Sequence, residues 1–557
     1  MQAFTTVAMK LLALAFLSFA LSACNITATS TEGGSVSFSP VSTQSCTATD
    51  GVCFTYGDTE TVTLSPVAEP GFEFVGWSGE CSGMGFCEVL ADDDKSVHAQ
   101  FVRIEDLVIT NTSADLETVL ENNRFAGACD RYFADPAGAS EYLTLMCGKW
   151  MFFYDGFGAS GLPQGLAEYM TQYLPNTVGT GFSKFGMIPD PYSETGLPLG
   201  FPVGRELAPG IPTLAYGCAS CHFGKTRDGR FSVGHPNHEY DYGNQILASA
   251  YFPTFATESE ISEEDYAPET VALMQPLLEE YASSNSSIQL LSALLPLTTI
   301  PAEEMQDIDI PVEYQSYYAS WKSGVQDFMI TPVGIDDEVH TATKIQHLWE
   351  IPTPEEMAAS GGPHSAMLSS FGGALSLEQF FQGFLLISAV DGESFGIERG
   401  IPLVKYVYSL EAPSNPNPPA VESVAKGEAL FASKGCAGCH NGPGYSGTRI
   451  FTFDEIGTDD ALRFWGDKDQ DGEQDFPSVD GTNGITHGVK APRMNGIWSL
   501  TRLLHNGSVE SLDDLFCMDR ARPTIEEYVF SDKGHMMTCD GLSDEEKQDL
   551  ISYLNTL

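Results

Sequence analysis

The chain has 557 residues and carries 76 acidic side chains against 27 basic ones, which gives a formal net charge of −49. This balance excludes a nucleic-acid-binding protein, because contacts with phosphates need clustered Lys and Arg. Since 42% of the residues are hydrophobic and 11% are aromatic, the chain can bury several cores, and its length predicts about three or four domains.

The N-terminus has the pattern of a secretory signal. Lys10 precedes the apolar run Leu11–Ala23, which is too short to cross a bilayer as a helix. The string Leu21-Ser22-Ala23-Cys24 resembles a bacterial lipobox. We therefore predict a lipoprotein signal peptide over residues 1–23 and a lipid anchor on Cys24, with an ordinary cleaved signal as the alternative. The predicted location is the periplasm or the outer membrane of a Gram-negative bacterium.

Export predicts the state of the cysteines, because thiols form disulfides in an oxidising compartment. Of the 13 cysteines, Cys24 is assigned to the anchor and four lie in two Cys-x-x-Cys-His strings. The other cysteines fall into local pairs, and we predict four disulfides: Cys46 with Cys53, Cys81 with Cys87, Cys129 with Cys147, and Cys517 with Cys539.

The N-terminal part predicts a tether and a β-module. Residues 24–40 are rich in Ser, Thr and Gly, as in flexible tethers. Over residues 34–103, short alternating apolar stretches separated by turn residues predict a small all-β module. The strings 71–79 and 96–101 resemble an internalin-type B repeat, and that resemblance implies a spacer or an adhesion surface.

Beyond this module the pattern is helical. Apolar residues recur with helical periodicity around 114–122, 139–155, 164–174, 267–296 and 376–388. Residues 104–412 are predicted to form one helical domain, and the Pro-rich stretch 413–419 a linker. Residues 420–557 then form a compact unit that ends in a helix, whose Ser543 and Glu546 fit a capping box. The expected fold is mainly α, preceded by the β-module.

Two strings have the form required for c-type haem attachment, Cys218-Ala219-Ser220-Cys221-His222 and Cys436-Ala437-Gly438-Cys439-His440. In each, two thiols can bond to the vinyl groups of one porphyrin, and the adjoining His can bind the iron from the same face. Zinc binding and thiol redox chemistry are the alternatives. We predict two covalent c-type haems, with His222 and His440 as proximal ligands, in an N-terminal haem domain over residues 104–412 and a C-terminal cytochrome c domain over 420–557.

The ligand on the opposite face of each haem iron decides whether that haem transfers electrons or binds an oxidant. Candidates near the second haem are His505, Met518 and His535, which lie in the same region as His440. A ligand there would suit electron transfer. No equivalent candidate stands out for the first haem, so its open iron could bind dioxygen or peroxide.

These strings and several others resemble the dihaem cytochrome c peroxidase superfamily, and within it the branch that includes the rubber oxygenases. The resemblance spans roughly residues 140–557 and includes strings at 216–222, 321–327, 348–352, 426–431, 491–498, 504–509 and 534–535. It implies two facing cytochrome c domains, with substrate chemistry at the first haem and electron relay at the second. It also implies a Trp between the haems, best matched by Trp321. For the distal ligand its strings point to His505 and His535, and the peroxidase arrangement points to a Met near Met518; of these we favour His535, then Met518 and His505. Gln326 stands where the family has Arg, and no distal carboxylate aligns, which weakens a peroxidase assignment.

A further acidic motif could hold calcium, because alternating carboxylates before a Gly converge on one hard cation. Its candidate ligands are Asp467, Asp469, Asp471 and Asp475. A solvated acidic loop is the alternative.

The sequence thus predicts an exported dihaem oxidoreductase that reduces peroxide or activates dioxygen. The alternatives are a dioxygenase that cleaves an olefinic substrate and a non-enzymatic electron-transfer cytochrome. The acidic surface favours a redox partner that presents a basic patch, with membrane contact only through the lipid anchor.

Overall fold

The computed structural model describes residues 23–57, 59–156, 159–258, 263–300, 310–327, 340–360, 368, 370, 376–381, 397–466, 488–525 and 529–557. The chain divides into two compact units. The first comprises Met1–Thr110 and Leu120–Trp150, and the second comprises Asn111–Val119 and Met151–Leu557. Both haem-type motifs belong to the second unit.

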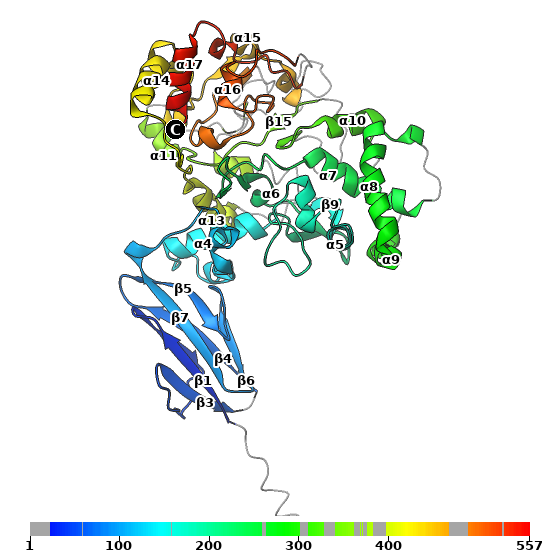
Figure 1. Ribbon diagram of the computed structural model, residues 1–557. Helices are drawn as coiled ribbons and strands as arrows, with labels where there is room; N and C mark the ends of the chain where they lie inside the picture. Colours follow the sequence, from blue (N-terminus) through cyan, green and yellow to red (C-terminus); the bar gives the residue numbers. More distant parts are fainter. Residues whose placement is uncertain are drawn as a thin grey trace, which may run out of the picture. The chain divides into compact units, whose positions relative to one another are not determined.

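The first unit begins with a module of two sheets, drawn in blue in Figure 1. One sheet has the strand order β3-β1-β7-β5, in which β1 and β7 are parallel, and the other has the order β2-β4-β6. The strands are β1 (Ala23–Ser30), β2 (Gly34–Ser39), β3 (Val52–Gly57), β4 (Glu60–Ala68), β5 (Phe72–Gly79), β6 (Cys87–Ala91) and β7 (Lys95–Arg103).

Alternating side chains of the two sheets form one core, which includes Ile26, Val62 and Trp77. The predicted β-module is therefore present, but residues 24–40 form β1 and β2 instead of a tether. Their Ser and Thr residues are compatible with strands because polar side chains alternate with buried ones. Cys24 lies in β1 and is buried.

The remainder of the first unit is helical and includes α3 (Ala128–Ala134) and most of α4 (Glu141–Tyr154). A disulfide joins Cys129 to Cys147 between these helices. All four predicted disulfides are confirmed, since Cys46–Cys53, Cys81–Cys87 and Cys517–Cys539 are also bonded.

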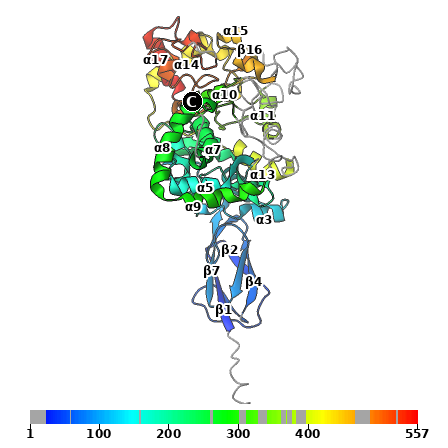
Figure 2. The same ribbon diagram turned by 90° about the vertical axis from the view of Figure 1, so that its right-hand side faces the viewer.

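Helices and small sheets alternate along the second unit (Figures 1 and 2). The helices include α2 (Leu116–Val119), α5 (Gln164–Tyr173), α6 (Cys218–His222), α7 (Tyr242–Thr257), α8 (Pro268–Ser284), α9 (Ser287–Leu294), α10 (Val312–Ser320), α11 (Pro354–Ala359), α13 (Ile397–Tyr408), α14 (Val421–Ser433), α15 (Phe453–Ile456), α16 (Leu512–Leu515) and α17 (Asp544–Leu554).

Four small sheets lie among the described residues of this unit. Their strand orders are β10-β11-β9, β12-β13-β8, β14-β15 and β16-β17. The strands are β8 (Thr112–Ser113), β9 (Ala159–Pro163), β10 (Val203–Ala208), β11 (Ile211–Ala215), β12 (Phe223–Lys225), β13 (Phe231–Val233), β14 (Val325–Gln326), β15 (Thr343–Lys344), β16 (Ile450–Thr452) and β17 (Gly488–Lys490).

The segments with the clearest helical periodicity form helices. The predicted segments 139–155, 164–174 and 267–296 correspond to α4, α5 and the pair α8 and α9. The capping box at the start of α17 is confirmed, since the Glu546 N–H donates to Ser543 Oγ and the Ser543 N–H donates to Glu546 Oε2. Helix α17 packs along α14, as both ribbon views show.

The prediction of a mainly α chain with two cytochrome c-like haem domains is wrong as a fold class. Strands occur in both units, and the region beyond residue 420 combines short helical turns with the β16-β17 pair. The missed strands have a physical reason: segments of two or three residues, such as β14 and β15, are too short to show an alternating pattern. The architecture is a mixture of helices and small sheets.

Candidate haem-attachment sites

The first motif forms the short helix α6 in the interior of the second unit. Cys218, Ala219 and Ser220 are buried. The backbone of Gly200 lies against this turn, where an added Cβ would be 2.0 Å from the Ser220 nitrogen. A glycine is therefore required at position 200 for the motif to pack as it does.

The ring of His222 has a fixed orientation. Its Nδ1 lies 2.8 Å from the carbonyl oxygen of Gln346. Because a carbonyl only accepts hydrogen bonds, Nδ1 carries the proton and Nε2 keeps its lone pair. A backbone carbonyl on the other ring nitrogen is the usual partner of a metal-bound His. His222 therefore has the tautomer that a proximal iron ligand needs.

Burial changes the acid–base properties of this motif. It lowers the pKa of His222 to about 4, so the imidazole is neutral at neutral pH. It raises the pKa of Cys221 to about 11 and also raises that of Cys218. Because the thiolate is the reactive form of cysteine, these thiols would be poor redox nucleophiles. This environment favours haem attachment over dithiol redox chemistry.

The second motif lies at the surface. Cys436 begins a 3-10 turn, and its carbonyl accepts a hydrogen bond from the His440 N–H at 2.9 Å. Ala437 and Gly438 are exposed, whereas the corresponding residues of the first motif, Ala219 and Ser220, are buried. The two motifs therefore differ in their access to solvent.

The ring of His535 lies near that of His440, with 6.2 Å between the centroids and 64° between the ring planes. A metal–imidazole bond is about 2 Å long, so two imidazoles on opposite sides of one iron have centroids about 6 Å apart. Burial lowers the pKa of both rings to about 4, and the neighbouring His440 and Arg522 lower the pKa of His535 further. The pair is thus neutral and has the spacing of two axial ligands.

The other two candidate ligands have different surroundings. Nε2 of His505 lies 3.2 Å from Asp459 Oδ2, and both side chains are buried. A ring nitrogen that is hydrogen-bonded to a carboxylate in this way is not free to bind iron. Met518 is half-buried beside the Cys517–Cys539 disulfide, and its N–H donates to the carbonyl of Asp513.

Lys344 and Lys490 are two of the buried lysines of this unit, and neither pairs with a carboxylate among the described residues. Lys490 Nζ donates to Ser446 Oγ and to the Gly447 carbonyl, and Lys344 Nζ donates to the Arg502 carbonyl. Burial lowers the pKa of Lys490 to about 7 and that of Lys344 to about 8. Buried ammonium groups normally have an anion beside them.

Lys490 lies close to the second motif, since the charge of Lys490 lowers the pKa of His440. A haem carries propionate carboxylates, which would supply the missing anion. The imidazole pair and the lysine therefore both fit a haem attached to the second motif. The sequence offered one signal for this lysine, its place in the otherwise uncharged stretch Gly488–Ala491.

Trp321 is buried in an aromatic cluster. Its ring stacks on Tyr242 at 6.0 Å and contacts Tyr317 and Tyr318. Tyr242 in turn contacts Tyr216, which precedes the first motif. Trp321 is thus linked by aromatic contacts to the neighbourhood of the first motif.

A second buried Trp connects segments of the two motif regions, and the sequence analysis did not assign it a role. Trp349 donates its indole N–H to the Val233 carbonyl at 2.8 Å. Its ring occupies the space beside Gly234 and Gly496, where an added Cβ would be 2.8 Å and 2.5 Å away. The Gly234 N–H donates to the His222 carbonyl. Trp349 therefore packs between the backbone behind His222 and the segment at 496.

The predicted calcium site receives no test. The candidate calcium ligands Asp467, Asp469, Asp471 and Asp475 lie outside the described residues. Within the described part of the chain, no three His, Cys, Asp or Glu side chains are grouped so as to hold a metal ion. No helix among the described residues is both long and apolar enough to span a bilayer.

Comparisons with known proteins give little. No family model matches the chain, and no curated protein matches its sequence. One solved structure, hydrazine synthase from Kuenenia stuttgartiensis pressurised with xenon, is similar at 19% identity over 43% of this chain and 79% of that chain, with a TM-score of 0.24. A likeness of this extent carries no argument about function.

Proposed function

We propose that the chain is an exported oxidoreductase that carries two covalent c-type haems, one on each Cys-x-x-Cys-His motif. The observation that carries the proposal is the imidazole pair of His440 and His535, at 6.2 Å between centroids, beside an attachment motif. The first motif, with its neutral His222 and its protonated Cys221 thiol, supports a haem at the first site as well.

The two sites are assigned different roles. The second motif is exposed at Ala437 and Gly438, and its iron would have a ligand on both sides, as suits electron transfer. The first motif is buried at Cys218, Ala219 and Ser220 and partly exposed at Cys221 and His222, and no distal ligand is assigned to it. We therefore propose that electrons enter at the second haem and that peroxide or dioxygen reacts at the first.

The haem iron would supply the redox chemistry, and the protein residues set its conditions. The Gln346 carbonyl orients His222, and burial keeps that imidazole neutral as an iron ligand. Lys490 would neutralise a propionate near His440. Trp321 and Trp349 supply aromatic groups close to the first motif, through which electrons could pass.

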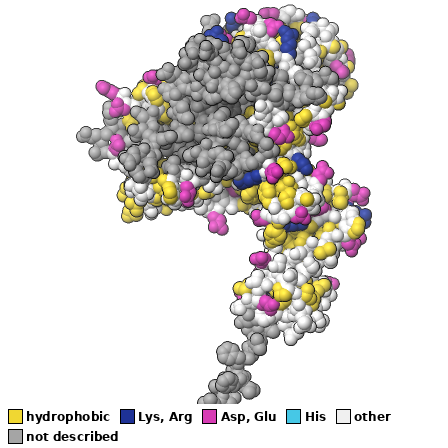
Figure 3. Space-filling model, turned by 180° about the vertical axis from the view of Figure 1, so that it is seen from behind, with side chains coloured by type: hydrophobic (Ala, Val, Ile, Leu, Met, Phe, Trp, Pro, Cys, Tyr) yellow, Lys and Arg dark blue, Asp and Glu magenta, His cyan; other side chains and the backbone are white. Residues whose placement is uncertain are grey.

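Export and partner choice form part of the same proposal. The N-terminal signal and Cys24 support a lipid-anchored protein that faces the periplasm, and the disulfides agree with an oxidising compartment. Acidic side chains outnumber basic ones on the described surface seen in Figure 3. An electron donor with a basic patch would complement this surface.

Electron paramagnetic resonance of the oxidised holoprotein, followed by mixing with peroxide or dioxygen, tests the proposal. We expect one low-spin signal from the second haem, one high-spin signal from the first, and a spectral change of the high-spin species alone. Turnover of peroxide with an electron donor would identify a peroxidase. A stable dioxygen adduct that needs no donor would identify an oxygenase. Two low-spin signals and no reaction with either oxidant would show an electron carrier instead.

A further inference from the structure

We propose that Arg522 is a positioning residue that holds His535 opposite His440. This inference rests on the proposed haem at the second motif and concerns a residue that is remote from the motif in sequence. Arg522 is buried, with 6% of its surface exposed. It lies within the loop that the Cys517–Cys539 disulfide closes and that also contains His535.

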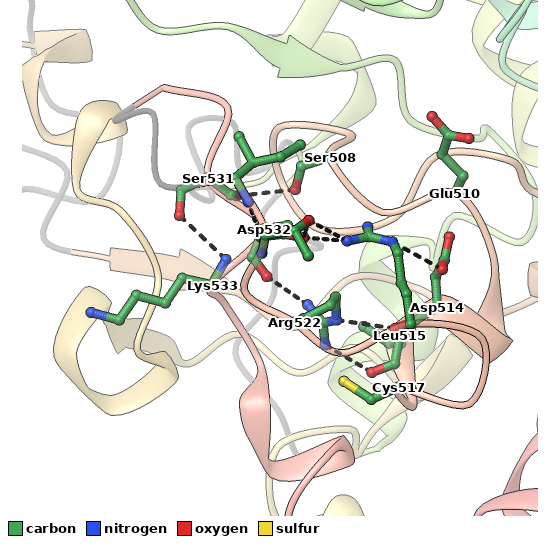
Figure 4. A network of polar contacts seen from close by, with 12 residues as sticks. Ser508, Glu510, Asp514, Leu515, Cys517, Arg522, Ser531, Asp532 and Lys533 are labelled. Carbon is green, nitrogen blue, oxygen red and sulfur yellow. Dashed lines mark hydrogen bonds and ion pairs between the residues drawn. The ribbon is translucent and has the colours of Figure 1, made fainter.

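The guanidinium of Arg522 binds backbone carbonyls of two segments, one just before this loop and one within it. Its Nε donates to Asp514 O at 3.0 Å, and one terminal nitrogen donates to Leu515 O at 2.8 Å. The other terminal nitrogen donates to Asp532 O at 2.7 Å and to Gly534 O at 3.1 Å. Figure 4 shows Arg522 between the two segments. One side chain therefore ties the segment just before the loop to the residues just before His535.

The peptide group before His535 is held at both ends. Its carbonyl, on Gly534, accepts from Arg522, and its N–H, on His535, donates to the Ile456 carbonyl at 3.1 Å. The His535 carbonyl accepts from the Thr538 hydroxyl at 2.9 Å. His535 itself has φ = 60°, a left-handed conformation that is uncommon for a non-glycine residue. Such a conformation persists where the surroundings determine it, as these hydrogen bonds do.

The neighbouring Arg520 differs in its contacts and is a suitable control. It binds the side chains of Asp514, just before the loop, and Asp532, within it, and it is about one third exposed. Asp532 is fully buried and also accepts the Thr524 N–H. Arg520 therefore stabilises the loop without contacting the peptide group before His535.

Only an arginine can fill the role of Arg522. Its planar fork presents five donors in fixed directions, whereas a lysine offers one nitrogen that cannot reach carbonyls on both segments. Arg522→Lys should therefore keep the buried charge but lose the bridge to Gly534. Arg522→Gln removes the charge as well and shows whether charge contributes.

The experiment compares the holoproteins of Arg522→Lys, Arg522→Gln and Arg520→Gln by electron paramagnetic resonance. We expect both Arg522 variants to lose most of the low-spin signal of the second haem, and added imidazole to restore it. Arg520→Gln should keep the low-spin signal. Low-spin signals of wild-type intensity in both Arg522 variants would overturn the inference, as would equal losses in all three proteins.

Amide hydrogen exchange of residues 534–539 separates this inference from the proposed function. If the wild-type protein lacks the low-spin signal, the haem or ligand assignment fails. The positioning role is then judged by exchange alone, because loss of hydrogen bonds to a charged group should speed exchange of this segment by roughly tenfold in the Arg522 variants. Unchanged exchange in these variants would overturn it.

Discussion

Replacing Lys490 by Met tests whether an anion accompanies the second motif. Lys490 is buried and bonds only to Ser446 Oγ and the Gly447 carbonyl, without a carboxylate in the described part of the chain. In the chain without haem, this ammonium group should destabilise the folded state. In the holoprotein, a propionate beside it should remove the penalty.

The magnitude follows from the pKa. Burial lowers the pKa of Lys490 from 10.5 to about 7. Each pKa unit of difference between the folded and unfolded states changes the free energy of unfolding by about 1.4 kcal/mol, so the full destabilisation is roughly 5 kcal/mol. Above both values the amine is neutral in both states. As the pH falls below 10.5, the unfolded chain takes up the proton first, so stability is lost until the pH reaches about 7.

The assay is chemical denaturation at pH 7 and pH 10 of four proteins: the wild type and Lys490→Met, each with and without haem. The haem-free wild type should gain roughly 3–4 kcal/mol more than haem-free Lys490→Met between these pH values. With haem, this difference should disappear, and Lys490→Met should be the less stable protein at pH 7.

Lys426→Met is the matched control, because Lys426 is half exposed and pairs with Glu422 on the surface of α14. Such surface ion pairs contribute little to the free energy of unfolding. An equal pH dependence of wild type and Lys490→Met without haem would refute the stated burial penalty. The same difference with and without haem would refute the presence of an anion.

The other predictions concern the disulfide, the excluded ligand and the buried Trp. Replacing Cys517 and Cys539 by Ser should lower the free energy of unfolding by about 3 kcal/mol, as denaturation under non-reducing conditions can check; an unchanged midpoint would contradict it. His505→Gln should lower the melting temperature, because it removes the buried contact between the imidazole and Asp459, but should not alter the low-spin spectrum; a loss of that spectrum would make His505 a ligand. Trp321→Phe should slow electron transfer between the haems in rapid-mixing experiments without changing either spectrum, and an unchanged rate would exclude this residue from the path.

Several features could be predicted because they depend on local sequence. The disulfides join cysteines close in the chain, and the capping box at Ser543 needs only a residue three positions later. The two Cys-x-x-Cys-His strings are likewise recognised from five consecutive residues each. His535 could be proposed as an iron ligand from the sequence because few side chains in the C-terminal region can bind iron.

The rest depends on tertiary structure. The strands β14 and β15 pair across distant segments and are too short to leave a periodic pattern. Arg522 contacts backbone carbonyls, which every residue has, so no sequence pattern marks its partners. Residues 24–40 have a composition shared by tethers and exposed strands, and only pairing with β3, β4 and β7 decides between them.

The most direct test of covalent haem at both motifs is peptide mass spectrometry of the protein purified from a host that attaches c-type haem. We predict that the peptides containing Cys218–His222 and Cys436–His440 each carry one haem bound through two thioethers. The cysteines of the four disulfides should be oxidised in pairs. Free thiols, or a disulfide within either Cys-x-x-Cys-His motif, would contradict the account.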